Sequence, residues 1–309
     1  MKIKRIRNFS KITNYHKECI ITIGNFDGVH LGHQKLINKL KLESKKRNLP
    51  MILLVFEPQP KEYLCKFAPK RITIFRDKIK YFKYMGVNQV LCINFNRYFA
   101  KLHAKYFITE FLVRILNIKC IVIGEDFKFG YKAHGNIDLL KNQGDKLGFD
   151  VLEIKTCKIN HERISSTKIR NALKKNDLKN AEKMLGHKYC ISGKIIHGSA
   201  IGRTIGVPTI NISLKKKKLA INGVYAVELK GISKNLIYGI ANIGIKPTFF
   251  GVEQSIEVHI LNLYGNFYFK HVEIVINKKI REEKFFSSIL ELKKQISNDI
   301  KNVKKYFFK

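Results

Sequence analysis

The sequence predicts an α/β fold, in which a doubly wound parallel sheet is followed by a small antiparallel β-barrel and a C-terminal helix. Up to about residue 186, short apolar runs alternate with stretches of helical periodicity, the pattern of a parallel sheet covered by helices. From residue 187 to about 279, strand-like runs alternate with glycine turns, as in small barrels. We therefore predict two domains, residues 1–186 and 187–309.

Each predicted element follows from its local pattern. The strand-like runs of the first part are apolar and rich in β-branched residues, and helical spacing marks the stretches between them. The strands are 20–23, 52–56, 90–95, 121–124 and 151–154, and the helices are 34–47, 76–85, 103–116, 136–147, 167–174 and 177–185. In the second part the candidate strands are 189–197, 223–230, 236–243, 254–263 and 271–280. The last helix follows Ser288 and Glu291, which are spaced as a capping box.

Composition places the chain among ordinary folded proteins, with 45% hydrophobic residues over 309 positions. The six cysteines are scattered and form no Cys-x-x-Cys pair, so free thiols in a reducing compartment explain them better than disulfides or zinc. The basic N-terminus is not followed by a signal-like apolar core, and no run is long enough to span a membrane. We expect a cytoplasmic protein without a membrane partner.

The formal net charge of +35 is unusual. It could indicate a surface that binds nucleic acid. However, lysine is dispersed along the whole chain and forms one compact run, at 215–218. We favour a compositional bias over solvated faces and expect no specific nucleic-acid partner. The protein is expected to be a monomer or a weak oligomer.

The most informative stretch runs from Gly24 to His33 and reads Gly-Asn-Phe-Asp-Gly-Val-His-Leu-Gly-His. It joins a predicted strand to a predicted helix, which is where ligands bind in open α/β sheets. A helix start offers free backbone N–H groups to phosphate, and His30 and His33 can reach the same phosphate from there. The alternative is a helix cap and a solvent-facing side chain, which we consider less probable in this context.

This stretch resembles the His-x-Gly-His motif of the nucleotidyltransferase superfamily, in the longer form found in bacterial FAD synthetases. The first domain is therefore expected to have the nucleotidyltransferase fold. The resemblance implies that His30 and His33 bind the phosphates of ATP. It also implies an ATP site that includes Gly24, Asn25, Phe26 and Gly32.

Three further stretches of the first part are similar, in the same order, to bacterial bifunctional riboflavin kinase/FMN adenylyltransferases. They are the turn at 56–60, the loop at 124–130 and the helix start at 164–170. The resemblance implies that Ser166, Thr167 and Arg170 hold ATP phosphates, and that Asp126 and Gln59 contact the flavin. The family usually has histidine where this chain has Gln59. Taken singly, the serines could equally be helix caps and Asp126 a turn residue.

The second informative motif spans 197–211, where Gly198, Gly202 and Gly206 recur at a spacing of four. Such a loop can wrap phosphates with its backbone amides. Thr209 and Asn211 share one face of an extended segment and carry hard oxygen atoms suited to Mg²⁺.

The motif resembles the signature of riboflavin kinases, which implies that the three glycines and Arg203 bind ATP and that Thr209 and Asn211 hold Mg²⁺. It also implies that Glu257, in the segment Ile-Glu-Val-His, is the general base of the kinase. Without the resemblance, Glu257 would read as an outward residue of an alternating strand.

Together the two resemblances imply an enzyme that makes FMN from riboflavin and then FAD from FMN, with ATP as co-substrate and Mg²⁺ as cofactor. One alternative retains only the kinase, with Gln59 marking a weakened adenylyltransferase. A second alternative is a basic nucleic-acid-binding protein that is not an enzyme. Intact candidate residues, among them His30, His33 and Glu257, argue against the second alternative.

Overall fold

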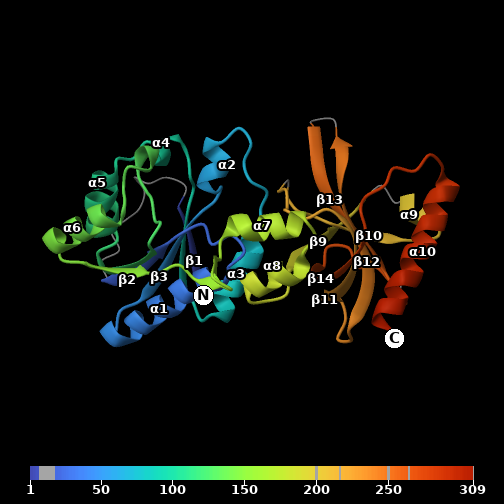
Figure 1. The fold of residues 1–309 in the computed structure, drawn as a ribbon, viewed down its shortest axis with the longest axis horizontal. Helices are drawn as coiled ribbons and strands as arrows, with labels where there is room; N and C mark the ends of the chain where they lie inside the picture. Colours follow the sequence, from blue (N-terminus) through green and yellow to red (C-terminus); the bar gives the residue numbers. More distant parts are fainter. Residues whose placement is uncertain (7–17, 199–200, 216, 249–250, 264, 309) are drawn as a thin grey trace. The chain divides into compact units, whose positions relative to one another are not determined.

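The computed structural model describes residues 1–6, 18–198, 201–215, 217–248, 251–263 and 265–308. It forms two compact units: residues 1–69 with 78–165, and residues 70–77 with 166–309. Figure 1 shows the sheet of the first unit and the barrel of the second.

The first unit is built on a parallel sheet of six strands. Its elements are β1 (Lys2–Ile6), β2 (Cys19–Ile23), α1 (Leu31–Arg47), β3 (Met51–Phe56), α2 (Pro60–Leu64), β4 (Gln89–Ile93), α4 (Arg97–Ala100), α5 (Ala104–Tyr106), η2 (Phe107–Ile115), β5 (Ile118–Gly124), η3 (Tyr131–Ala133), α6 (Ile137–Leu147), β6 (Asp150–Ile154), β7 (Lys158–Ile159) and β8 (Glu162–Arg163). Helix α3 (Phe75–Tyr84) begins in the second unit and continues in the first. The strand order is β1-β4-β3-β2-β5-β6, and every pair is parallel.

Helices cover both faces of this sheet. Ile21 and Ile23 of β2 share one core cluster with Phe107 and Phe111 of η2. Successive strand residues point to opposite faces, so Ile20 and Thr22 face the other side, and helix α1 also packs against β2. The side chains on both faces of β2 are buried. The sequence of this strand therefore does not alternate between apolar and polar residues. The predicted doubly wound sheet is confirmed.

The strand order has a topological switch point at β2. After β2 the chain adds β3 and then β4 on one side, and it later returns to add β5 on the other side of β2. Ligands of open α/β sheets bind at such a switch point, beyond the carboxyl ends of the strands. The loops 24–30 and 124–130 follow β2 and β5, so both predicted motif loops lie at these ends.

The second unit is a closed antiparallel barrel of six strands, β10-β13-β12-β11-β14-β9, as predicted. Its elements are α7 (Ser166–Lys174), α8 (Leu178–Leu185), β9 (Cys190–Ile196), α9 (Ile201–Thr204), β10 (Thr209–Ile212), β11 (Gly223–Lys230), β12 (Ile237–Thr248), β13 (Gly251–Ile260), β14 (His271–Arg281) and α10 (Ile289–Phe307). Val303 of α10 packs in one apolar cluster with Val224, Ala226 and Ile240 of the barrel. Helix α10 therefore covers one face of these strands. Side chains point alternately to the two faces of a strand, so every second residue shares the face that α10 covers.

The segment 70–77, which lies between α2 and α3 in the sequence, is part of the second unit. Arg71 pairs in parallel with Leu219, and the Tyr189 hydroxyl donates to the Ile72 carbonyl at 2.9 Å. The buried Asp77 carboxylate accepts hydrogen bonds from Ser192 of β9, from the backbone N–H at 3.3 Å and from the hydroxyl. The compact units thus place α7 and α8 with the barrel, whereas the predicted boundary at 186/187 follows α8. As a boundary between catalytic domains, 186/187 stays a prediction.

Most predicted elements are present, with instructive differences. Strand β1 was not predicted, because three of its five residues are basic and no apolar run marks it. For β10 only an extended segment at Thr209 and Asn211 was predicted, because its polar residues interrupt the apolar run. The predicted helix 103–116 consists of the short α5 and the π-helical η2. The Ser288 hydroxyl caps α10 as expected, but the Glu291 carboxylate bonds to the backbone N–H of Ser287 in place of that of Ser288.

The six cysteines are free, and Cys65 is exposed whereas Cys19, Cys92 and Cys120 are buried.

Over the described ranges, no helix combines the length and the apolar character needed to cross a membrane.

Replacing Asp77 by alanine should loosen strand β9. The change leaves the buried backbone N–H of Ser192 without its acceptor, which costs about 1–3 kcal/mol. Hydrogen exchange of β9 amides, measured by mass spectrometry, should therefore speed up in Asp77→Ala. The exposed Asp145, replaced by alanine, serves as the control. Unchanged exchange in β9 would show that segment 70–77 does not stabilise the barrel.

Candidate active sites

The loop after β2 has an unusual backbone. Phe26 and Val29 have positive φ angles of 47° and 43°, a conformation that is costly for a bulky or β-branched residue. Such strained positions are concentrated at functional sites. Helix α1 begins directly after this loop, with His30 as its N-cap: the His30 Nδ1 accepts the backbone N–H of His33 at 3.4 Å. His30 thus does serve as a helix cap.

The two histidines are stacked on each other. Their ring centroids are 3.6 Å apart and the rings are inclined by 20°, and the Phe26 ring lies 5.1 Å from that of His33. A Cβ atom at Gly32 would approach the His30 ring to 3.2 Å, so a glycine at this position leaves room for the stack. The structure therefore brings together His30, His33, Phe26 and Gly32 of the predicted ATP site.

The stacked arrangement keeps His33 uncharged. Burial lowers the pKa of His33 well below its usual value, and the charges of His30 and Lys78 lower it further. A neutral imidazole can donate one hydrogen bond and accept another, but it does not attract phosphate as a cation does. His33 is therefore suited to orient a phosphate by hydrogen bonding. Within the described residues, the His33 Nδ1 is buried and has no hydrogen-bond partner.

Among the residues that the structure describes, other buried polar atoms near the carboxyl ends of β2 and β3 also have no hydrogen-bond partner. They are Thr22 Oγ1, Asn25 Oδ1 and Gln59 Nε2. Thr22 and Asn25 stand at the end of β2, and Gln59 follows β3. Buried polar atoms in native proteins are nearly always paired, so these atoms are candidates to bind a polar ligand. The Gln59 side chain would serve it as a hydrogen-bond donor.

The remaining predicted residues of the first motif set do not join this group in the described contacts. Asp126 is exposed and forms an ion pair with Arg163. Ser166, Thr167 and Arg170 lie in the first turns of α7, in the second unit, where the Arg170 Nε donates to the Lys70 carbonyl at 2.8 Å. Their binding to ATP or flavin stays a prediction.

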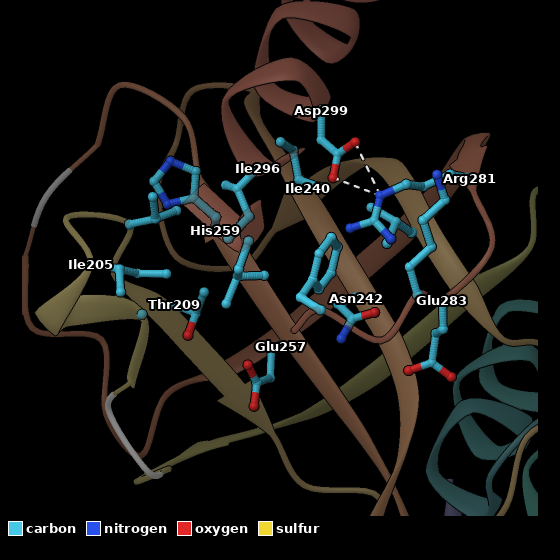
Figure 2. A pocket seen from close by; sticks show the side chains of 16 residues that line it. Ile205, Thr209, Ile240, Asn242, Glu257, His259, Arg281, Glu283, Ile296 and Asp299 are labelled. Atoms are coloured by element: carbon cyan, nitrogen blue, oxygen red, sulfur yellow. Dashed lines mark hydrogen bonds and ion pairs between the residues drawn. The ribbon is translucent and has the colours of Figure 1, made fainter. Parts of the chain in front are cut away.

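The second unit contains a cavity of about 310 Å³ between the barrel strands and α10. Figure 2 shows polar side chains of Thr209, Asn242, Glu257 and His259 on the strands that line it. Apolar side chains also line it, namely Ile205, Val207, Val224, Ile240, Phe286, Leu292 and Ile296, together with Gly202 and the charged residues Arg281, Glu283, Lys284 and Asp299. The cavity therefore combines apolar walls with polar and charged groups, as small-molecule sites do.

Strand register places the polar groups side by side. Glu257 of β13 pairs with Asn211 of β10 on one side and with Asn242 of β12 on the other. Directly paired residues point to the same face, so one carboxylate lies between two amides. Thr209 pairs with His259 in the next row of that face. The structure thus brings together the three residues predicted for the base and the metal.

The glycines of the 197–211 motif permit close packing around these groups. A Cβ atom at Gly198 would overlap the Asn211 side chain, and one at Gly202 would lie 3.3 Å from the Thr209 hydroxyl. Gly206 has a φ of +80°. Part of the expected open loop is the short helix α9, in which Arg203 is exposed. Ser199 and Ala200 lie outside the described residues.

A buried ion pair joins α10 to the end of β14. The Arg281 Nε is 2.9 and 3.2 Å from the two carboxylate oxygens of Asp299, and Gln295 donates to the same carboxylate at 2.8 Å. Figure 2 shows this pair beside the cavity. Sequence reasoning missed Asp299, although an acidic residue within the apolar stripe of a helix was a detectable signal. It also missed Asn242 and Lys78.

Across the described ranges, no group of three or more His, Cys, Asp or Glu residues could hold a metal ion. Thr209 and Asn211 carry the neutral oxygens expected of a Mg²⁺ site that is completed by substrate phosphates. Their adjacency to Glu257 fits that chemistry.

Comparisons with known proteins agree with both motif sets. The FAD synthetase family model matches residues 12–168 and the riboflavin kinase family model matches residues 185–307. Curated relatives described as bifunctional riboflavin kinase/FMN adenylyltransferase include that of Escherichia coli K12, 43% identical over 99% of this chain and 98% of the relative. The relative from Buchnera aphidicola of Acyrthosiphon pisum is 47% identical over 99% of this chain and 98% of its own length.

One solved structure resembles the whole fold. It is described as a macrolide-efflux protein from Streptococcus pneumoniae and is 29% identical, with a TM-score of 0.80 over 98% of both chains.

Acidification should destabilise the first unit through His33. An unfolded histidine has a pKa of about 6.5, whereas the folded pKa lies well below that value. Below pH 6.5 the unfolded state therefore binds more protons, and stability falls as the pH falls. Between pH 7.5 and 5.5 His33 should therefore contribute a measurable loss of stability.

The measurement is the urea unfolding of the first unit at both pH values, followed through hydrogen exchange of α1. The variant His33→Gln should lose correspondingly less stability over this interval. Equal losses in the variant and the wild type would show that His33 is charged in the folded state.

Proposed function

Because the chain belongs to the family of bifunctional riboflavin kinase/FMN adenylyltransferases, we propose that its two parts catalyse successive reactions. Residues 187–309 transfer the γ-phosphate of ATP to riboflavin, and residues 1–186 join the AMP part of a second ATP to the FMN produced. The observation that supports the kinase most directly is the carboxylate of Glu257, placed between two amides beside an apolar cavity.

In the kinase reaction, the apolar lining of the cavity receives the flavin ring and leaves the ribityl chain near the polar row. Glu257 accepts the proton of the terminal ribityl hydroxyl as that oxygen attacks the γ-phosphorus of ATP. The bond between the γ-phosphorus and the β,γ-bridging oxygen breaks, and ADP leaves. Asn211 and Asn242, the strand neighbours of Glu257, keep the carboxylate in a polar surrounding.

Thr209 and Asn211 are the residues that would hold Mg²⁺ together with the ATP phosphates. When bound, the cation neutralises phosphate charge. Gly198, Gly202 and Gly206, with Arg203, would line the path of the phosphates. The close approach of Gly198 to Asn211 and of Gly202 to Thr209 supports a role in shaping the metal ligands.

In the adenylyl-transfer reaction, a phosphate oxygen of FMN attacks the α-phosphorus of ATP and pyrophosphate leaves. The FMN phosphate is already an anion, so no protein base is required, and positioning supplies the catalysis. His30 and His33 would donate hydrogen bonds to the ATP phosphates, within the site formed by Gly24, Asn25, Phe26 and Gly32. Ser166, Thr167 and Arg170 would bind the departing pyrophosphate, and Asp126 would contact the flavin.

The bifunctional reading is favoured over a kinase alone and over a nucleic-acid-binding protein. Gln59 occupies the place of the usual family histidine, but its side-chain N–H₂ group is buried and unpaired in the described structure. Such a group can position a ligand without transferring a proton. We also propose a cytoplasmic location, which the free thiols favour.

The variant Glu257→Gln should lose FMN formation and retain FAD formation from supplied FMN. The amide keeps the shape of the side chain but cannot take the hydroxyl proton, and loss of a general base costs about 10² to 10⁴ in rate. The assay supplies riboflavin or FMN with ATP and Mg²⁺ and separates the flavins by chromatography. Glu253→Gln, on the same strand and exposed, is the control. Near-normal FMN formation by Glu257→Gln would place the base elsewhere.

The variant His33→Ala should show the reciprocal loss. Removing one preorganised phosphate donor lowers the rate of FAD formation by about 10² to 10³, while riboflavin phosphorylation by the same sample stays near the wild-type rate. The same chromatographic assay measures both products. A parallel fall in both activities would mean that His33 supports folding of the chain in place of adenylyl transfer.

A further inference from the structure

Two side chains of helix α3 support the loop that carries the histidine motif. The Lys78 Nζ donates to the main-chain carbonyl of Asn25 at 2.9 Å. The Phe82 ring meets the Phe26 ring edge-on, with the centroids 5.5 Å apart. Lys78 and Phe82 are four residues apart and so lie on the same face of α3. One helix face therefore touches consecutive residues of the loop after β2.

The burial of Lys78 needs an explanation beyond packing. Its side chain is 1% exposed, and lysine is almost never fully buried unless it is paired. Burying an ammonium group is costly unless hydrogen bonds compensate it. The Asn25 carbonyl is one such partner, and it belongs to a loop whose backbone is itself strained at Phe26 and Val29. Strained backbone persists only where its surroundings hold it in place.

A residue of this loop is in direct contact with the histidines. Phe26, next to Asn25, packs on His33, and His33 stacks on His30. A shift of the Asn25 carbonyl would therefore be passed to the ring of His33. Hydrogen bonds to a reacting phosphate lose much of their effect after displacements of about 1 Å, so the support from α3 bears on catalysis.

The charge of Lys78 has a second effect at the same place. It disfavours a proton on His33, in the same direction as burial and the charge of His30. Among the described residues, His30 in the stack and Lys78 from α3 act on His33; the same loop also carries the buried Asp27, and Cys157 lies beside Gly32. Of these, Lys78 is the permanent cation.

We propose that Lys78 is a positioning residue for adenylyl transfer: it holds the Asn25 carbonyl and thereby fixes His33 in line with the ATP phosphates. This inference rests on the proposed function of the first domain. It gives helix α3 a role in the reaction, although no residue of α3 belongs to the sequence motifs of the site.

The test replaces Lys78 by methionine, which keeps the length and apolar stem of the side chain but removes the donor and the charge. FAD formation from FMN and ATP is measured against ATP concentration and pH, and riboflavin phosphorylation by the same sample is the internal control. The variant Lys83→Met, exposed on the same helix, is the matched control. Lys78→Arg restores a charged donor.

We expect kcat/KM for FAD formation to fall at least tenfold in Lys78→Met, with riboflavin phosphorylation unchanged. Because the variant lacks the cation that opposes protonation of His33, the acid limb of the pH profile should move to higher pH. Lys78→Arg should recover much of the rate and the wild-type acid limb, and Lys83→Met should match the wild type. A purely structural role would not move the acid limb.

Three results would overturn the proposal. They are wild-type FAD formation by Lys78→Met, a fall in rate with an unmoved acid limb, and a loss of FAD formation that accompanies thermal unfolding of the first unit. Absence of FAD formation by the wild type would instead overturn the proposed function. The two failures are therefore distinguishable in one set of assays.

Discussion

Hydrogen-bonded strand pairing positions the side chains of the candidate site in the barrel. Glu257 lies between Asn211 and Asn242 because three neighbouring strands pair at that level. Side chains alternate between faces, so a slip of one residue in β13 would turn Glu257 away from the cavity and bring Ile256 or Val258 in its place. Closure of the barrel opposes such a slip, because every strand has two partners. The relative positions of these side chains are therefore set by the backbone hydrogen bonds between the strands.

In the first unit, the order of the strands in the sheet positions the residues of the candidate site. The parallel ladder brings the ends of β2, β3 and β5 to one edge of the sheet, and the histidine motif occupies the central end. The loop after β2 then departs from regular geometry, at Phe26 and Val29, and α3 supports it from outside. A regular parallel sheet with one strained loop, supported by α3, thus holds two imidazoles in contact.

The sequence was sufficient to predict the fold class, and it singled out candidate site residues that belong to contiguous motifs. His30, His33, Thr209, Asn211 and Glu257 were identified because each stands in a short pattern tied to a strand end or a strand face. Residues that contact the candidate sites from distant parts of the chain were not singled out.

Lys78 is 53 positions from its partner Asn25, and Asp299 is 18 positions from Arg281. No local periodicity links such pairs. The segment 70–77 was missed for the same reason, since its partners lie beyond residue 165.

That segment has a consequence for the order in which the protein can be made. Asp77 and Ser192, which bond to each other in the buried interior, are 115 residues apart. A ribosome adds about 5–20 residues per second, so the Asp77 carboxylate emerges roughly 6–23 s before its partner has been synthesised. During that interval segment 70–77 belongs to a nascent chain in which its partner strand β9 does not yet exist. The barrel therefore cannot complete its contacts with this early segment until Ser192 has been synthesised.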